Sequence, residues 1–175
     1  GLDYFLPDLD ANHQSFFFEK QLDLAEEFNL PVILHVRRSQ DAILKALRPR
    51  KIIGGIAHAF NGSFQQAEQF IKLNFMMGFG GAMTFPRALQ IRRLANELPF
   101  ESLVLETDAP DIPPAWLAKQ TNHRNEPAEL VEISSVLAEI RSSSISQTQS
   151  ICANNALRVI PRWATLLAQL PLSKD

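Results

Sequence analysis

The chain has 175 residues, 46% of them hydrophobic and 21% charged, which is the composition of an ordinary soluble globular protein. Its formal net charge of −2 excludes a general attraction to nucleic acid or membranes, so a polyanion would need a local cluster of cations. The single cysteine, Cys152, has no disulfide partner within the chain, and the sequence contains no signal peptide and no long apolar span. We therefore expect one cytoplasmic domain over residues 1–175, without a membrane partner, in which Cys152 is inert.

Apolar runs of strand length recur along the chain. They cover residues 31–35, 51–58, 75–81 and 102–108, and the opening GLD has the pattern of a strand that ends in a loop. Short runs that are almost continuously apolar are typical of parallel strands covered on both faces. Because these runs alternate with helical segments, the sequence predicts an α/β fold with a parallel sheet and right-handed crossovers.

The first helical segment has one apolar face and stops near Asn29, a residue suited to the C-terminal end of a helix. The apolar face consists of Phe17, Phe18, Leu22, Ala25 and Phe28. Ser39 is placed to cap the second helix, and Ser63 with Gln66 forms a capping box for the third. A fourth helix is predicted at residues 87–98, so a helix fills each gap between consecutive strands.

The last third of the chain has a different organisation. An irregular stretch rich in proline and asparagine covers residues 109–125, where no helical period is present. Two further helices are predicted at residues 127–141 and 147–158. The second of these has Ser146 and Gln149 as its capping box.

Polar side chains stand where three of the predicted strands end. His35 ends the first full strand, His58 the second and Asp108 the fourth, while glycines crowd the end of the third. In a (β/α) barrel the C-terminal ends of the strands share one face, so these side chains would meet, and two imidazoles with a carboxylate suit a divalent metal. A single such histidine is more often a structural residue, and Asp108 with Pro110 also fits a turn. The recurrence at three strand ends favours the metal site.

Two more residues belong to the surroundings of this site. Arg37 lies two residues past His35, on the same side of an extended strand end, where it would bind a phosphate; a surface salt bridge fits the pattern equally well. Glu106 shares the direction of Asp108 in a regular strand, and we expect it to support the site from behind. The residues expected to be solvated and outside the site are His13, Asp111 and His123.

Three segments resemble a known family. PVILHVR, GIAHAFNGS and LVLETDAP, in this order and separated by helices, resemble the TatD family of metal-dependent hydrolases. GLDYF resembles the end of that family's fourth strand, and RNEP resembles the segment after its last strand. The resemblance implies a TIM-type (β/α)8 barrel of the metal-dependent hydrolase superfamily, of which this chain would form the C-terminal part, strands 5 to 8 with the end of strand 4. It also implies a deoxyribonuclease that hydrolyses phosphodiester bonds with one or two divalent ions, Mg, Mn or Zn.

The same resemblance implies a role for each candidate residue. His35 in the fifth strand and His58 in the sixth would be ligands of one metal ion. Asp108, at the end of the eighth strand, would bind the other ion and act as the catalytic residue that takes the proton from the attacking water. The expected substrate is DNA or a small phosphoester.

The chain departs from the family pattern in its N-terminal region. The family's first-strand His-x-His pair and its bridging fourth-strand Glu have no counterpart here, and the chain begins at Gly1 without Met. We expect a portion of a complete hydrolase, impaired on its own because half of the metal ligands are missing. Two alternatives stay open: a homodimer that pairs through exposed barrel edges, and a non-catalytic half-barrel module that binds phosphorylated ligands through Arg37, Arg38 and the glycine-rich loops.

Overall fold

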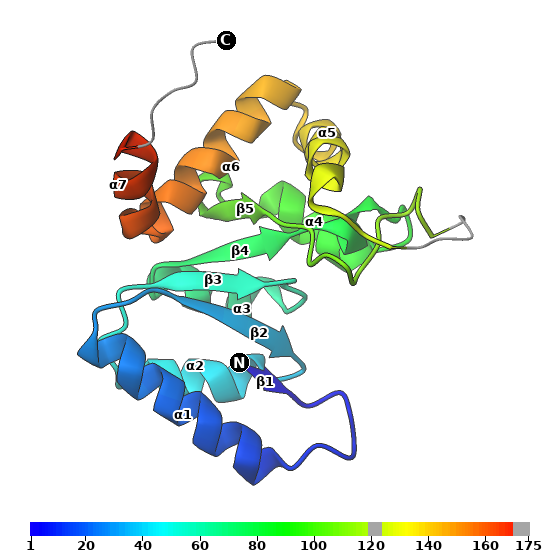
Figure 1. Ribbon diagram of the computed structural model, residues 1–175. Helices are drawn as coiled ribbons and strands as arrows, with labels where there is room; N and C mark the ends of the chain where they lie inside the picture. Colours follow the sequence, from blue (N-terminus) through cyan, green and yellow to red (C-terminus); the bar gives the residue numbers. More distant parts are fainter. Residues whose placement is uncertain (119–123, 170–175) are drawn as a thin grey trace.

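The structure, a computed structural model, describes residues 1–118 and 124–169, so His123 and part of the predicted irregular stretch lie outside the described residues. Its centre is one parallel five-stranded sheet in which the strands follow each other in chain order (Figure 1). The strands are β1 (Leu2–Asp3), β2 (Val32–Arg37), β3 (Gly55–His58), β4 (Phe75–Phe79) and β5 (Leu103–Leu105). The predicted α/β fold with a parallel sheet is confirmed.

One helix connects each strand to the next. These helices are α1 (Ala11–Glu27), α2 (Gln40–Leu47), α3 (Phe64–Lys72) and α4 (Leu89–Glu97). Three helices follow β5, namely α5 (Leu130–Arg141), α6 (Ile145–Val159) and α7 (Pro161–Gln169), and the sequence analysis did not predict the last of them. Single 3₁₀ turns, η1 to η3, lie at Gly81–Thr84, Phe100–Ser102 and Pro127–Glu129. No helix in the described parts of the chain is long and apolar enough to cross a membrane.

The strand side chains alternate between two faces of the sheet. One face carries Leu34, Ala57 and Met77, which are buried in the main hydrophobic core together with side chains of α1 to α6. The other we call the histidine face; it carries Ile33, His35, Ile56, His58, Met76 and Val104. The end of α6 covers part of the histidine face, where Val159 packs against Met76 and Val104. The β2 part of that face is open, and Ile33 is 67% exposed.

The predicted end of α1 and the predicted starts of α2 and α3 agree with the structure in part. The capping box of α3 is confirmed, because Gln66 N–H donates to the Ser63 hydroxyl at 3.1 Å and Ser63 N–H donates to the Gln66 side chain at 2.9 Å. Asn29 follows the end of α1 with a φ of +50°, as expected for a residue at that position. Ser39 precedes α2 as predicted, but its hydroxyl donates to the carbonyl of Leu2 at 2.6 Å instead of capping the helix. This bond ties β1 to the start of α2.

The predicted apolar face of α1 was too wide. Phe17 is 60% exposed and Phe28 is 54% exposed, so the expectation that both are buried is wrong. The buried stripe consists of Phe18, Leu22 and Ala25. These three residues are four and three positions apart and share one side of the helix, whereas Phe17 is rotated away from them and Phe28 lies past the last turn.

The predicted start of α6 was two residues too late. The helix begins at Ile145, and the hydroxyl of Ser144 accepts the N–H of Gln147 at 3.1 Å, so Ser146 and Gln149 do not form the cap. The serine-rich sequence offers the same cap pattern twice, and the earlier one adds two residues to the helix. Within α6, Cys152 is buried, and burial raises the pKa of its thiol to about 11.

Candidate functional site

The three predicted site residues lie together at the C-terminal edge of the sheet. His35 and His58 are paired in register between β2 and β3, and their ring centroids are 6.2 Å apart. Asp108 follows β5, and its Oδ2 lies 3.4 Å from Nε2 of His58. The His58 side chain is 17% exposed, against 50% for His35 and 39% for Asp108. His58 is therefore the buried centre of the group, with a more accessible residue on either side.

Glu106 fixes the orientation of the His58 ring. Its Oε1 lies 3.0 Å from Nδ1 of His58 and also accepts the N–H of Ala59 at 2.6 Å. The hydrogen bond to Glu106 raises the pKa of His58, against the opposing effect of burial, and the negative charges of Glu106 and Asp108 add to the increase. A proton held on Nδ1 leaves Nε2 of the neutral ring as the ligand atom. Glu106 thus has the supporting position expected from the sequence.

Gly78 makes the contact between Glu106 and His58 possible. β4 lies between β3 and β5, so the Glu106 side chain has to cross β4 to reach His58. A Cβ atom built on Gly78 would overlap Oε2 of Glu106. The glycine is needed here for close approach of a neighbouring side chain. The corresponding sequence signal is the cluster of glycines at the end of the third predicted strand.

Asp3, at the end of β1, belongs to the site and was missed by the sequence analysis. Its Oδ2 lies 3.1 Å from Nε2 of His35 and 3.8 Å from the guanidinium of Arg37, and its Oδ1 accepts the N–H of Phe5 at 2.8 Å. Burial alone would raise the pKa of Asp3, but the bonds from Phe5 and His35 and the charge of Arg37 together lower it. The available signal was a carboxylate at the end of a strand, the same signal that pointed to Asp108.

Strained backbone conformations occur at the same edge. Arg38, Ala59 and Asp108 have φ values of +54°, +47° and +58°, in the left-handed region that residues other than glycine rarely adopt. Arg38 directly follows β2, Ala59 directly follows β3, and Asp108 lies just past β5. Such conformations persist only where the surroundings hold them, and they turn side chains away from the regular alternation of a strand.

Asn125, in the segment RNEP, holds the loop that carries Asp108. It is buried, and its Nδ2 donates to the carbonyls of Thr107 at 2.5 Å and Asp111 at 2.7 Å. Its backbone N–H donates to the carbonyl of Pro110 at 3.2 Å. Asn125 therefore closes the loop on both sides of Asp108, a positioning role that no spacing pattern in the sequence indicated.

The donor types at this edge suit a divalent metal. An ion bound by two imidazoles lies about 3.2 Å from each ring centre, so tetrahedral coordination places the centres about 5.2 Å apart. The centres of His35 and His58 are 6.2 Å apart, and the rings would have to move about 1 Å closer to share an ion. However, no group of three or more His, Cys, Asp or Glu side chains is arranged to hold an ion within residues 1–118 and 124–169. His35, His58 and Asp108 thus fit as part of a ligand set rather than as a complete one.

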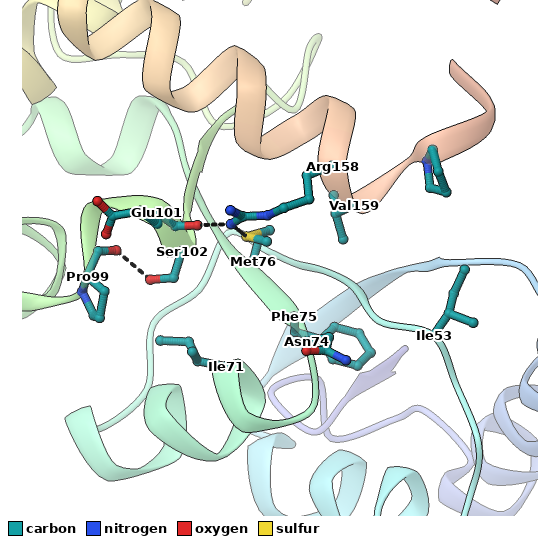
Figure 2. A pocket seen from close by; sticks show the side chains of 11 residues that line it. Ile53, Ile71, Asn74, Phe75, Met76, Pro99, Glu101, Ser102, Arg158 and Val159 are labelled. Atoms are coloured by element: carbon teal, nitrogen blue, oxygen red, sulfur yellow. Dashed lines mark hydrogen bonds between the residues drawn. The ribbon is translucent and has the colours of Figure 1, made fainter. Parts of the chain in front are cut away.

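A separate cavity of about 510 Å³ lies at the opposite ends of the strands. Figure 2 shows Met76 from the start of β4 and Arg158 and Val159 from the end of α6 in its wall. The Arg158 guanidinium donates to the carbonyl of Glu101 and lies 3.7 Å from the sulfur of Met76. This cavity contains none of the predicted site residues, and its arginine is already engaged.

The sequence is similar to proteins of one known family. A sequence model of the family described as TatD related DNase matches residues 1–161. The metal-dependent hydrolase YjjV of Escherichia coli K12 is 39% identical over 159 residues, 89% of this chain and 59% of YjjV. A metal-dependent hydrolase of Haemophilus influenzae is 40% identical over 75% of this chain and 58% of its own length. A protein of Klebsiella pneumoniae named 3'-5' ssDNA/RNA exonuclease TatD is 37% identical over 85% of this chain and 57% of its own length.

The solved structures give the same result. The crystal structure of Escherichia coli YjjV superimposes with a TM-score of 0.85 at 36% identity, covering 92% of this chain and 61% of YjjV. The chain thus spans about 60% of the length of the curated relatives that it matches. Its parallel sheet and connecting helices have the TIM-barrel-like TatD fold. With the family model covering nearly all of it, the chain belongs to the TatD related DNase family.

Proposed function

We propose that this protein is a metal-dependent hydrolase that cleaves phosphodiester bonds in single-stranded nucleic acid. One observation carries the proposal: Glu106 holds Nδ1 of His58, so that Nε2 is directed to Asp108 beside a second histidine at the C-terminal edge of the sheet. The names of the relatives support it, because the protein from Klebsiella pneumoniae is named a 3'-5' ssDNA/RNA exonuclease and YjjV a metal-dependent hydrolase.

The proposal assigns a role to each of the site residues. His35 and His58 hold a divalent ion, Mg, Mn or Zn, and Asp108 holds a second ion where two are bound. The ion supplies Lewis-acid stabilisation of the charge that develops on the phosphoryl oxygens. A carboxylate oxygen of Asp108 accepts the proton of the attacking water. Arg37, whose guanidinium lies 3.8 Å from Asp3, binds a phosphate of the nucleic acid strand beside the phosphodiester that is cleaved.

We also propose that the five strands correspond to the C-terminal part of a (β/α)8 barrel, strands 4 to 8. The sheet is open within the described residues, since β1 and β5 each pair with a single neighbour. The incomplete ligand set at the histidines supports the same proposal. A barrel would bring further strand ends, and therefore further ligands, to the same mouth.

The test is hydrolysis of a labelled single-stranded oligonucleotide by the complete barrel protein that we propose. We expect cleavage that requires Mn²⁺ or Mg²⁺ and stops in EDTA. Asp108→Asn should reduce kcat by at least about a hundredfold because the proton acceptor is lost. The melting temperature should stay nearly the same, since asparagine tolerates the left-handed conformation at this position. Turnover by Asp108→Asn at a comparable rate, or cleavage that persists in EDTA, would contradict the proposal.

A second candidate is a non-catalytic module that pairs with another copy of itself. The observation that favours it is the open part of the histidine face, where the large apolar side chain of Ile33 is 67% exposed. A second copy would cover this surface and the sheet edges at the same time. Phosphorylated ligands would then be bound by the arginines after β2 without being cleaved.

A further inference from the structure

Two consecutive arginines reach one aromatic ring beside the candidate site. The guanidinium carbon of Arg37 lies 3.9 Å from the centroid of the Phe5 ring, and that of Arg38 lies 4.7 Å from it. In a regular strand two successive side chains point to opposite faces. The left-handed φ of +54° at Arg38 breaks this alternation and allows both guanidinium groups to meet the same ring. A strained backbone conformation at Arg38 therefore accompanies the contact of two positive charges with one ring.

The protein neutralises only part of the positive charge of this group. Arg37 forms an ion pair with Asp3 at 3.8 Å, whereas Arg38 forms no ion pair within the described residues. The Phe5 ring attracts both cations through its electron-rich face but carries no net charge. Two adjacent guanidinium groups with spare N–H donors match the non-bridging oxygens of a phosphate. Both arginines are exposed, and so is Phe5 at 43%, which leaves the group accessible to a ligand.

The group is tied directly to the candidate metal ligands. Asp3 accepts the N–H of Phe5 on one carboxylate oxygen and faces Nε2 of His35 with the other. The Phe5 loop and the histidine are therefore held by opposite ends of one carboxylate. A nucleic acid strand whose reacting phosphodiester lies at the histidines would carry its neighbouring phosphate to this position.

We propose that Phe5, Arg37 and Arg38 form a subsite for a backbone phosphate of a nucleic acid strand, adjacent to the phosphodiester that is cleaved. The proposal rests on the proposed function for the identity of the ligand. Arg37 and Arg38 bind the phosphate, and Phe5 is a positioning residue whose ring contacts both guanidinium groups. The subsite favours substrates with at least two phosphates over mononucleotides.

The test measures binding without hydrolysis, so its failure is distinct from failure of the proposed reaction. Fluorescence anisotropy with a labelled octathymidylate in EDTA gives the dissociation constant of the full-length protein as a function of salt. Arg38→Ala should raise this constant about tenfold and reduce the slope of log K against log salt by about 0.7, the loss of one phosphate contact. Arg48→Ala is the matched control. Arg48 is exposed at the end of α2, so this substitution removes the same charge away from the proposed subsite.

A second pair of variants tests the role of the ring. Phe5→Leu keeps an apolar side chain and the backbone bond to Asp3, so the urea midpoint should not change while the dissociation constant rises severalfold. Phe5→Trp should bind like the parent protein because it keeps an aromatic face. The proposal is overturned if Arg38→Ala binds within twofold of Arg48→Ala, or if Phe5→Leu binds like the parent protein. Equal binding of an uncharged methylphosphonate octathymidylate would also overturn it, since the contacts would then be to bases.

Discussion

At the scale of single residues, the site depends on one carboxylate that reaches across a strand. Glu106 contacts His58 from beyond β4, and the missing side chain of Gly78 provides the space. A supporting hydrogen bond of this kind fixes the ring orientation and the tautomer of a metal-binding histidine. The geometry of the site is therefore set by a glycine that has no chemistry of its own.

The first prediction concerns that glycine. Gly78→Ala places a methyl group where Oε2 of Glu106 lies, so the carboxylate has to move away from His58. We expect the slowly exchanging Nδ1–H resonance of His58 to disappear from the proton NMR spectrum, as it should in Glu106→Gln, where the acceptor loses its charge. Gly62→Ala is the control, because its neighbours are the ends of the Phe60 and Gln66 side chains, and it should keep the resonance. A resonance that survives in Gly78→Ala would show that Glu106 does not orient the ring.

Residue types at strand ends could be predicted from the sequence, whereas contacts across the sheet could not. His35, His58 and Asp108 were found because each ends an apolar run, and the ends of parallel strands meet at one edge. Asp3 was missed, although the opening GLD had the pattern of a strand end, because only the ends of the longer apolar runs were compared. Asn125 was missed because its four backbone partners depend on a loop conformation that sequence spacing does not determine.

At the scale of elements, a half-buried arginine joins two helices on the far side of the sheet. Arg50, just after α2, lies 2.7 Å from Asp23 and 3.2 Å from Glu26 of α1 and also contacts Glu19. Its side chain is only 17% exposed. The hydrogen bond from Arg50 lowers the pKa of Asp23, and the acidic partners raise the pKa of Arg50 in turn. The three carboxylates sit on one stripe of α1, so the arginine also relieves their mutual repulsion.

The second prediction follows from this cluster. Arg50→Ala leaves three neighbouring carboxylates without their shared cation, and we expect the free energy of unfolding to fall by about 2 kcal/mol. Lys20→Ala is the matched control, because Lys20 pairs with Asp23 at 3.0 Å but is 62% exposed, and it should cost less than about 0.5 kcal/mol. Urea titrations of both variants make the comparison. Equal losses would mean that the Arg50 cluster contributes no more than a surface ion pair.

The apolar periodicity of the sequence predicted six of the helices, but the residues near some helix ends suggested the wrong boundary. Repeated serines before α6 offered two equivalent caps, and the sequence contains no information that ranks them. The apolar residues of α1 are more numerous than the stripe that the sheet can cover, so Phe17 was wrongly expected to be buried. The short helix α7 begins at Pro161, with only Ile160 between it and the end of α6, and its pattern merges with that of α6.

At the scale of the whole molecule, the histidine face is covered unevenly. The end of α6 packs on β4 and β5, while Ile33 on β2 remains exposed. Exposed apolar surface of this kind near the edge strand β1 favours association.

The third prediction is that this chain, purified alone at micromolar concentration, forms a dimer through that surface. Ile33→Lys should shift the molar mass measured by light scattering towards that of a monomer, since a buried lysine would be left unpaired in the interface. Leu89→Lys changes an apolar side chain that is 74% exposed on α4 and should leave the mass unchanged. A monomeric parent chain, or a dimer that is insensitive to Ile33→Lys, would exclude this interface.

The most direct test of the central claim, that His35, His58 and Asp108 form part of a metal site, is a calorimetric titration of this chain with Mn²⁺. We expect weak binding, far from stoichiometric saturation, because the three side chains do not complete a ligand set. The binding should be lost in His35→Ala and in His58→Ala and retained in His13→Ala, whose exposed imidazole lies outside the site. Binding that persists in the double variant of His35 and His58 would place the ion elsewhere and contradict the account, and tight stoichiometric binding by the parent chain would contradict the incomplete ligand set.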